Sequence, residues 1–173
     1  KLQVNSGTTR PDGVPYSALI YQIRARVLKI MERQRELLKD LLAQLAQHGV
    51  FVGHINELPE LWQHALERYF REEIFPVLTP LAVDHARPFP FISNLSLNLA
   101  VSLRRIDKPN DPPEFVRLKV PDLTARLVNL EPVLRQYAGG EYDRDQARST
   151  FVWIEDLIAS NVGHLFPGME VLH

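Results

Sequence analysis

The stretch that decides the fold runs from Tyr69 to Val101 and reads YFREEIFPVLTPLAVDHARPFPFISNLSLNLAV. Its first seven residues continue an amphipathic helical pattern, and Pro76 is expected to end that helix, because a proline pushes the residue before it out of the α region. Prolines then crowd the chain as far as Pro90. This part is too apolar for a flexible linker, so it predicts an ordered, extended connection packed across the domain.

The end of this stretch begins the clearest strand of the sequence. Every second residue from Leu95 to Leu103 is Leu or Val, and the residues between them are Ser, Asn or Ala. This alternation predicts a strand with one buried face. A turn-forming segment, DKPNDPP, follows at residues 107–113, and alternation resumes from Phe115 to Val120. The two strands are therefore predicted to form a hairpin.

Upstream, the periodicity is helical. A helix is predicted from Pro59 to Phe75, since proline is favoured in the first turn, and Val50–Val52 forms a short buried link before it. A much longer helix is predicted over about residues 14–48, after a turn-rich linker at Gly7–Gly13, and Gly49 is expected to stop it. Its apolar residues recur at alternating steps of four and three, with one gap at Gln34: Tyr16, Ile20, Ile23, Val27, Ile30, Leu37 and Leu41.

A helix of this length spans on the order of 50 Å, at 1.5 Å per residue. One compact small domain cannot cover it, so we expect it to bridge two units or to pack in a helical bundle or hairpin. Its charged residues fall largely off the apolar stripe, and we interpret them as a solvated face.

Downstream of the hairpin, short strands are predicted at Arg126–Leu130 and Phe151–Ile154, and a helix at Glu155–Phe166, closed by Pro167 and Gly168. The segment Leu134–Asp145 is polar, contains Gly139–Gly140 and is predicted to be a loop, with the end of a short helix as an open alternative. Helices come first and strands later, which indicates an α+β fold with a largely antiparallel sheet.

Composition excludes several classes of site. The chain has 173 residues, a net charge of −1 and no cysteine. Disulfides, thiolate catalysis and thiolate metal sites are therefore excluded within it. No run approaches the roughly 20 apolar residues that span a bilayer, and the N-terminus has no apolar signal core. These features predict a cytoplasmic protein without an integral membrane segment, and association with a membrane surface stays open. The overall charge gives no general positive field that would attract nucleic acid.

The sequence offers no catalytic constellation. None of the six histidines lies in an HExxH spacing, and no glycine-rich phosphate loop or GxSxG motif occurs. The adjacent carboxylates Glu72–Glu73 and Glu155–Asp156 point in different directions on a helix, so neither is an acid–base pair. We therefore predict no catalytic, cofactor-binding or metal-binding residue. Only His85, in the proline-rich connection, has no structural explanation; the others are His48, His54, His64, His164 and His173.

Basic residues surround the predicted hairpin. Such clustering is what a polyanion-binding surface requires, but a solvated sheet face produces the same pattern more often, and we favour that interpretation. The residues concerned are Arg87, Arg104, Arg105, Lys108, Arg117 and Lys119.

These stretches resemble bacterial polyphosphate kinase of the ATP-dependent type that makes long chains. The resemblance rests on residues 69–84 (YFREEIFPVLTPLAVD), 87–101 (RPFPFISNLSLNLAV) and 151–171 (FVWIEDLIASNVGHLFPGMEV), with support from FVRLKVPDL at 115–123. The sequence departs from the family at His85, where proline is expected.

The resemblance implies a longer parent enzyme that reversibly transfers the terminal phosphate of ATP to polyphosphate through a phosphorylated histidine, with Mg²⁺. Residues 1–49 would end its N-terminal helical domain, which is spectrin-repeat-like. Residues 50–173 would form most of its middle or head domain, similar in fold to a small phosphohistidine phosphatase and truncated at its C-terminus. The catalytic motifs belong to C-terminal domains that this chain does not contain, so no catalytic residue is transferred.

On this basis we predict a structural and dimerisation portion of polyphosphate kinase, forming a homo-oligomer through the middle domain and the long helix. The fragment itself would use no cofactor, and ATP, Mg²⁺ and polyphosphate would be bound only by the full-length transferase. Two alternatives stay open: a stand-alone interaction module that docks partners on the long helix, and a small phosphate-handling enzyme in which His85 or His164 does the chemistry.

Overall fold

A computed structural model describes residues 15–83, 92–121 and 125–172. The chain divides into two compact units, Lys1–His48 and Gly49–His173. The predicted linker at residues 7–13, His85, Arg87 and His173 lie outside the described residues, as does the second half of the proline-rich connection.

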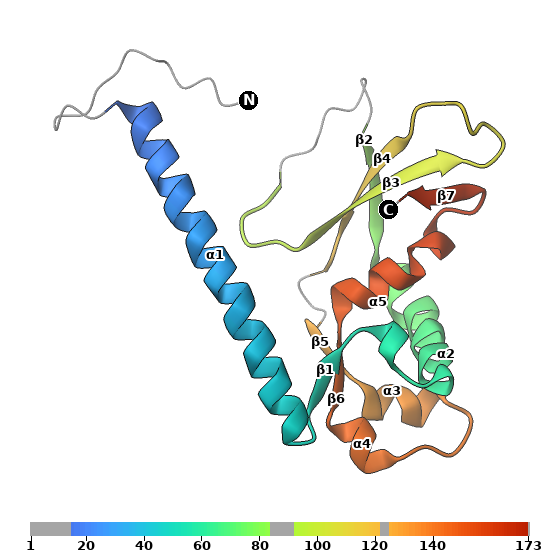
Figure 1. The fold of residues 1–173 in the computed structure, drawn as a ribbon. Coiled ribbons are helices and arrows are strands. Elements are labelled where there is room, and N and C mark those ends of the chain that lie inside the picture. The colour runs from blue at the N-terminus through green and yellow to red at the C-terminus, as the bar shows by residue number, and fades with distance from the viewer. Residues whose placement is uncertain (1–14, 84–91, 122–124, 173) are drawn as a thin grey trace. The chain divides into compact units, whose positions relative to one another are not determined.

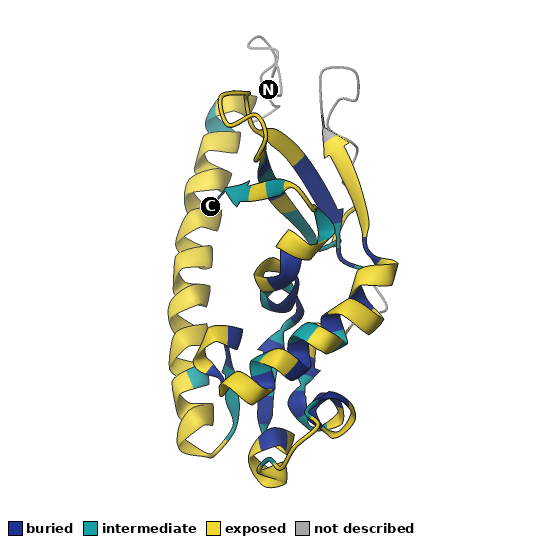
Figure 2. Ribbon diagram, turned by 90° about the vertical axis from the view of Figure 1, so that its right-hand side faces the viewer, coloured by how far each residue is buried: buried dark blue, intermediate teal, exposed yellow. Residues whose placement is uncertain are grey.

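The first unit contributes one long helix, α1 (Tyr16–Gln47), as the apolar periodicity predicts. It begins directly after Pro15, and the residue after its C-cap, Gly49, has φ +79°, a left-handed conformation that glycine adopts without steric cost. No residue of α1 is buried, and the helix is coloured as exposed along almost its whole length in Figure 2. Its apolar stripe is therefore uncovered within its own unit.

The second unit contains a four-stranded antiparallel sheet in the order β2-β4-β3-β7. Its strands are β2 (Thr79–Val83), β3 (Asn98–Arg105), β4 (Glu114–Lys119) and β7 (Met169–Leu172). The predicted hairpin is confirmed, since β3 pairs antiparallel with β4 and places Val101 opposite Val116. The residues at alternate positions, Val101, Leu103, Val116 and Leu118, are buried on one face. The period-2 pattern therefore identified the core face correctly.

A second, three-stranded sheet has the order β1-β6-β5. It consists of β1 (Phe51–Gly53), β5 (Leu127–Asn129) and β6 (Thr150–Trp153). β1 runs parallel to β6, whereas β5 runs antiparallel to it. The sheets are thus largely antiparallel with a single parallel pair among the described strands, and the α+β class is confirmed.

The helix predicted at Pro59–Phe75 is present but is not uniform. It begins as α2 (Glu60–Tyr69), widens into a π-helical turn over Phe70–Ile74, and ends in a 3₁₀ turn over Phe75–Val77. Pro76 therefore lies inside the last turn instead of ending the helix. A proline has no N–H to donate and its ring crowds the carbonyl four residues earlier. The wider turn, in which the Phe75 N–H reaches the Phe70 carbonyl, lets the chain continue past it.

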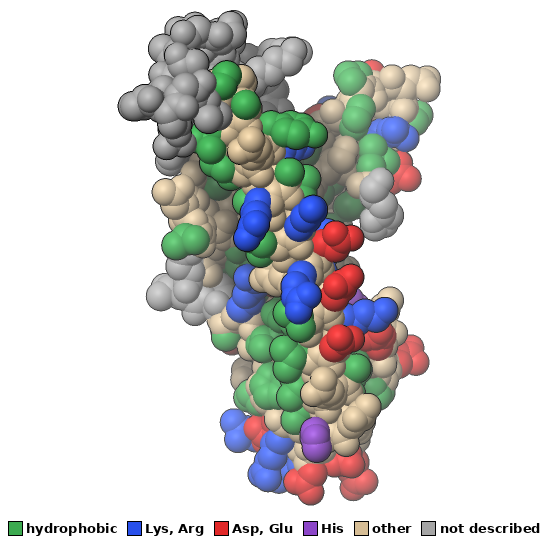
Figure 3. Space-filling model, turned by 60° about the vertical axis from the view of Figure 1, so that its left-hand side comes forward, with side chains coloured by type: hydrophobic (Ala, Val, Ile, Leu, Met, Phe, Trp, Pro, Cys, Tyr) green, Lys and Arg blue, Asp and Glu red, His purple; other side chains and the backbone are tan. Residues whose placement is uncertain are grey.

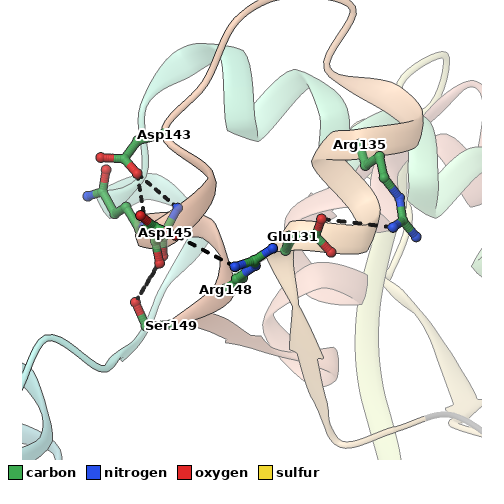
Figure 4. A network of polar contacts seen from close by, with 7 residues as sticks. Glu131, Arg135, Asp143, Asp145, Arg148 and Ser149 are labelled. Carbon is green, nitrogen blue, oxygen red and sulfur yellow. Dashed lines mark hydrogen bonds and ion pairs between the residues drawn. The ribbon is translucent and has the colours of Figure 1, made fainter.

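At Leu134–Asp145 the end of a short helix, left open by the sequence, is present as the end of α3 (Leu130–Tyr137). The loop prediction is wrong at the other end of the segment, where α4 (Arg144–Arg148) begins. Both helices are started by a side-chain cap: Asn129 accepts from the Glu131 N–H, and Asp143 accepts from the Asp145 and Gln146 N–H groups. Figure 4 shows the Asp143 cap together with the ion pairs of Arg135 and Arg148. The polar residues around these helices include the side chains that cap them, so a polar composition here does not indicate an absence of helix.

The last predicted helix is shorter than expected, with α5 covering Ile154–Asn161 and a 3₁₀ turn covering Val162–Leu165. α2, the π turn, α3 and α5 pack with both sheets around one hydrophobic core. Its largest fully buried side chains include Phe70, Leu66, Leu118, Leu134 and Leu157. Burial of large apolar side chains is the main source of stability in such a unit.

The strand predicted from Leu95 begins later, at Asn98. Leu95 has φ +59° and a relative exposure of 106%, so its side chain points into solvent from a turn. The edge strands β2 and β7 were not predicted as strands. β2 contains a proline and β7 is only four residues long, and neither shows a long alternating pattern.

Candidate functional site

Polar residues meet at one edge of the β1-β6-β5 sheet. β1 ends before His54, β6 ends before Glu155 and Asp156, and Arg126 precedes the antiparallel strand β5. The carboxyl ends of parallel strands are the edge at which α/β sheets bind ligands. Within this sheet, a ligand site would therefore be expected at this edge.

His54 is held there by two carboxylates. Its Nδ1 lies 3.1 Å from Asp156 Oδ1, and its backbone N–H donates to Glu57 Oε2 at 3.0 Å. The second oxygen of Asp156 accepts the Ile55 N–H at 2.8 Å. The hydrogen bond and charge of Asp156 raise the pKa of His54. The loop after β1 is thus tied to the first turn of α5 through one carboxylate.

The glycine before His54 is required by this arrangement. A Cβ at Gly53 would lie 2.3 Å from the Phe51 ring and 2.6 Å from Glu57 Oε2. Glu57 is the carboxylate that accepts the His54 N–H, so a larger residue would displace both the ring and the cap. The local sequence FVGHINE therefore folds as a unit.

A carboxylate-oriented imidazole is a common acid–base arrangement, and His54 was not selected in the sequence. The His54 side chain is 64% exposed, so its other ring nitrogen is open to solvent. However, Glu57 and Asp156 give the loop negative charge, which disfavours the approach of a phosphate anion. His54 therefore fits a structural role, connecting the loop after β1 to α5, better than the role of a nucleophile that accepts phosphate.

The neighbouring charges at this edge are also structural. Arg126 Nη2 donates to Glu155 Oε1 at 3.0 Å, and its guanidinium carbon lies 5.9 Å from the centroid of the Trp153 ring. The Arg126 carbonyl accepts the Ile154 N–H at 3.0 Å. These contacts fix the start of β5 against the end of β6. The adjacent carboxylates Glu155 and Asp156 have different partners, as their positions on a helix predict.

A second polar cluster lies between α2 and the turn after α5. Glu67 is at its centre: its carboxylate lies 3.2 Å from His164 Nε2, 2.8 Å from Arg71 Nη2 and 3.8 Å from His64 Nδ1. Of these residues, His64, Glu67 and His164 line a pocket of about 360 Å³. His64 and His164 thus share Glu67 as a partner, and the contact between Glu67 and His164 could not be found from sequence spacing.

The described part of the chain contains no group of three or more His, Cys, Asp or Glu side chains that could hold a metal ion. A further pocket of about 300 Å³ lies between β5 and α3 and is lined mainly by apolar side chains, with Tyr69 and Tyr137. Burial raises the pKa of both phenols, and the Tyr137 hydroxyl donates to Glu73 at 3.2 Å. These tyrosines thereby connect the π turn to α3.

The interpretation of the basic hairpin as a solvated face is wrong for Arg117. Its exposed fraction is 6%, and its Nε donates to Asn98 Oδ1 at 2.8 Å across the β3–β4 pair. Arg105 forms a two-bond pair with Asp107, with distances of 3.0 and 2.8 Å. The Nε of Arg104 is buried without a hydrogen-bond partner. Of the described basic residues, Arg117 and Arg105 are therefore engaged in contacts within the sheet and its turn.

The fold and its braces define an α+β domain in which the polar clusters of the described residues mainly connect secondary-structure elements. The structure resembles a crystal structure of polyphosphate kinase from Porphyromonas gingivalis, with a TM-score of 0.72 and 26% identity over 91% of this chain and 25% of that one. The family model described as polyphosphate kinase middle domain matches residues 62–173. The chain belongs to this family.

Curated relatives agree with this assignment. The chain is 40% identical to polyphosphate kinase 1 from Chlorobaculum tepidum over 98% of its length, and 40% identical to polyphosphate kinase from Thermosynechococcus vestitus over 99%. A polyphosphate kinase from Mycobacterium marinum is 38% identical. The chain spans about a quarter of the length of these relatives, 22 to 24%.

Proposed function

We propose that this chain is the structural and dimerisation portion of a polyphosphate kinase. The full-length enzyme would reversibly transfer the terminal phosphate of ATP to polyphosphate, using Mg²⁺, in the cytoplasm. The match of residues 62–173 to the middle-domain family supports this function most directly. In this proposal residues 1–49 end the helical domain that precedes the middle domain, and residues 50–173 belong to the middle domain.

The proposal assigns no catalytic, cofactor or metal residue to the chain. His54 and His164 are each engaged with a carboxylate, Asp156 and Glu67 respectively. A histidine that accepts phosphate needs nearby positive charge to receive the anion, as phosphoryl transfer relies on charge stabilisation. For His164, one arginine is close by: Arg71, which pairs with the same Glu67 carboxylate.

The proposal also includes homo-oligomerisation through the middle domain and the long helix. The support is physical: α1 exposes a stripe of large apolar side chains, including Val27 and Ile30, and contiguous exposed apolar surface is typical of interaction sites. A stand-alone interaction module would use the same stripe of α1.

Among the described residues, none of the helices is long and apolar enough to cross a membrane.

Phosphoryl transfer is the direct test. We expect the purified chain to form no labelled polyphosphate from γ-labelled ATP and Mg²⁺, and the complete product of its gene to form it. In the complete protein, His54→Ala and His164→Ala should keep most of the activity. Activity in the isolated chain that disappears with His164→Ala would instead establish the small phosphate-handling enzyme.

A gene that ends at His173 would contradict the assignment to a longer kinase and favour the stand-alone module. Light scattering of the complete protein, and of the chain alone, would show whether copies associate and whether this portion is sufficient.

A further inference from the structure

The proposed function leaves the pocket beside Glu67 without a role. The pocket lies between α2 and the end of α5 with the 3₁₀ turn that follows it. Its volume of about 360 Å³ is in the range of small-ligand sites. The surface of α1 has a different character, since Figure 3 shows apolar and basic side chains mixed along the outside of that helix. The pocket is lined by one apolar residue, Ile55, and by polar ones: Glu60, Gln63, His64, Glu67, Ser160, Asn161 and His164.

Two side-chain amides of the pocket use their nitrogen atoms elsewhere. Asn161 Nδ2 donates to the Leu157 carbonyl at 2.9 Å, and Gln63 Nε2 donates to the Leu58 carbonyl at 2.8 Å. Because these bonds identify the nitrogen of each amide, the oxygens Asn161 Oδ1 and Gln63 Oε1 are left, and neither accepts a hydrogen bond from the described residues. Asn161 has an exposed fraction of only 7%. A ligand that donates to its oxygen would therefore satisfy a group that little water can reach.

The charged side chains of the pocket are acidic. Glu60 and Glu67 line it, and no lysine or arginine is among the described residues that do so. Glu67 is paired with Arg71 at 2.8 Å. Glu60 has one ion-pair contact among the described residues, to His64 Nε2 at 3.6 Å, which is longer than a hydrogen bond. The carboxylate of Glu60 is thus available to a cationic ligand.

We propose that this pocket binds an alkylammonium group. An ammonium has three N–H donors and no acceptor, which matches the Glu60 carboxylate and the free oxygens of Gln63 and Asn161. Its alkyl chain would lie against Ile55, as the stem of a lysine packs on apolar surface. The carboxylates disfavour an anion, and the described residues contain no group of three or more His, Cys, Asp or Glu side chains that could hold a metal ion.

The test is an NMR titration of the ¹⁵N-labelled chain with n-butylammonium chloride, with 1-butanol as the uncharged control. We expect butylammonium to shift the side-chain amide signals of Asn161 and the backbone signals of Ser160 and His164, with a Kd of about 1–10 mM for so small a ligand. Binding should weaken as added NaCl screens the charges. Equal effects of the two probes, or no saturable shift at these residues, would overturn the inference.

The same chemistry can come from a free alkylamine or from a lysine side chain of another polypeptide segment. Two blocked amino acids separate these sources: Nα-acetyl-lysine methylamide, and Nα-acetyl-norleucine methylamide, whose side chain lacks the ammonium group. Binding of the lysine compound at least as tight as that of butylammonium would identify a lysine side chain, and weaker binding would identify a free amine. Equally tight binding of the norleucine compound would contradict an ammonium site.

Substitutions provide the matched comparison. Glu60→Gln changes a side chain that is 89% exposed and should weaken butylammonium binding at least about threefold. The control Glu141→Gln removes the same charge from an exposed glutamate that does not line the pocket and should leave binding unchanged. Asn161→Leu keeps the side-chain volume but removes the acceptor, and should weaken binding by a similar factor.

Glu60→Gln decides the outcome if Asn161→Leu does not fold, and undiminished binding in Glu60→Gln would refute the proposed site. Binding of the probe is measured without phosphoryl transfer. Its failure would therefore leave the proposed function standing, and a complete gene product that forms no polyphosphate would leave the ammonium site standing.

Discussion

The two units of this chain use the same kind of apolar periodicity with opposite results. In α1, a helix of 32 residues, the stripe runs from Tyr16 to Leu41 and no residue is buried. In α2 a stripe of only ten residues buries Trp62, Ala65 and Leu66 against the sheets and neighbouring helices. Periodicity therefore indicates which face of a helix will be covered, but not whether the same segment of chain supplies the cover. If the contrast is correct, substitutions in the two units should differ in their effect on stability.

The largest effect is expected from one substitution made in both units. Leu118→Ala removes a fully buried side chain from the central strand β4 and should lower the free energy of unfolding by about 3–4 kcal/mol, through lost burial and a residual cavity. Leu41→Ala in α1, where the side chain is 55% exposed, should change it by less than about 0.5 kcal/mol. Urea unfolding followed by the fluorescence of Trp62 and Trp153 reports the second unit, and far-UV circular dichroism of the same samples reports the helix α1. Equal losses would mean that α1 is already covered in the isolated chain.

The next effect concerns the loop that contains His54. Gly53→Ala should cost about 1–3 kcal/mol, because its Cβ would overlap the Phe51 ring and the Glu57 carboxylate. Gly163→Ala is the matched control, since a Cβ there meets nothing within 4 Å. Thermal unfolding of the two variants provides the comparison, and a Gly53→Ala protein as stable as Gly163→Ala would refute the proposed brace.

The network of Figure 4 predicts a smaller and graded pair of effects. Asp143→Ala removes a carboxylate that accepts two backbone N–H groups at the start of α4 and should cost about 1 kcal/mol. Arg148→Ala breaks an exposed ion pair with Asp145 at 3.7 Å and should cost less than about 0.5 kcal/mol. Denaturation midpoints of the two variants test this order. The reverse order would show that the ion pair, not the cap, stabilises α4.

The smallest effect is a dependence on pH. The partner Asp156 raises the pKa of His54 above its ordinary value of 6.5, so the protonated imidazole is favoured in the folded state. Its contribution is fully present below pH 6.5 and is lost as the pH rises through the folded-state pKa. Because the side chain is largely exposed, we expect only about 0.2 kcal/mol.

Unfolding across a pH series, with NMR titration of the imidazole, measures this effect. His54→Gln should remove this part of the pH dependence, and Asp156→Asn should lower the pKa of His54 while still accepting the Ile55 N–H. An unchanged titration of His54 in Asp156→Asn would mean that another group raises its pKa.

Much of the fold could be predicted because it depends on local pattern. The hairpin of β3 and β4, the long helix and the strand before α5 follow directly from period-2 and period-3.6 repeats. The edge strands β2 and β7 could not be predicted, since they become strands only by pairing with β4 and β3. The π turn was also missed, because it depends on how the chain accommodates Pro76.

The polar clusters illustrate the same limit. Arg117 alternates like a solvent-facing residue, yet it is buried beside Asn98 of the neighbouring strand. His54 and Asp156 are 102 residues apart, and only the parallel pairing of β1 with β6 brings them together. Sequence spacing shows partners along one element. It does not show partners that meet across a sheet edge.

The order of strands also affects how the protein is made. β1 and β5 both pair with β6, so neither has its partner until residue 153 has left the ribosome. The strands β2, β3 and β4 lie between β1 and β5 in the chain and can pair earlier, and β7 closes their sheet last. During synthesis, the hairpin should therefore wait with one apolar face open while the rest of the domain emerges. Such pairing between distant segments slows folding and prolongs exposure to aggregation, which makes this domain a candidate for chaperone assistance on the ribosome.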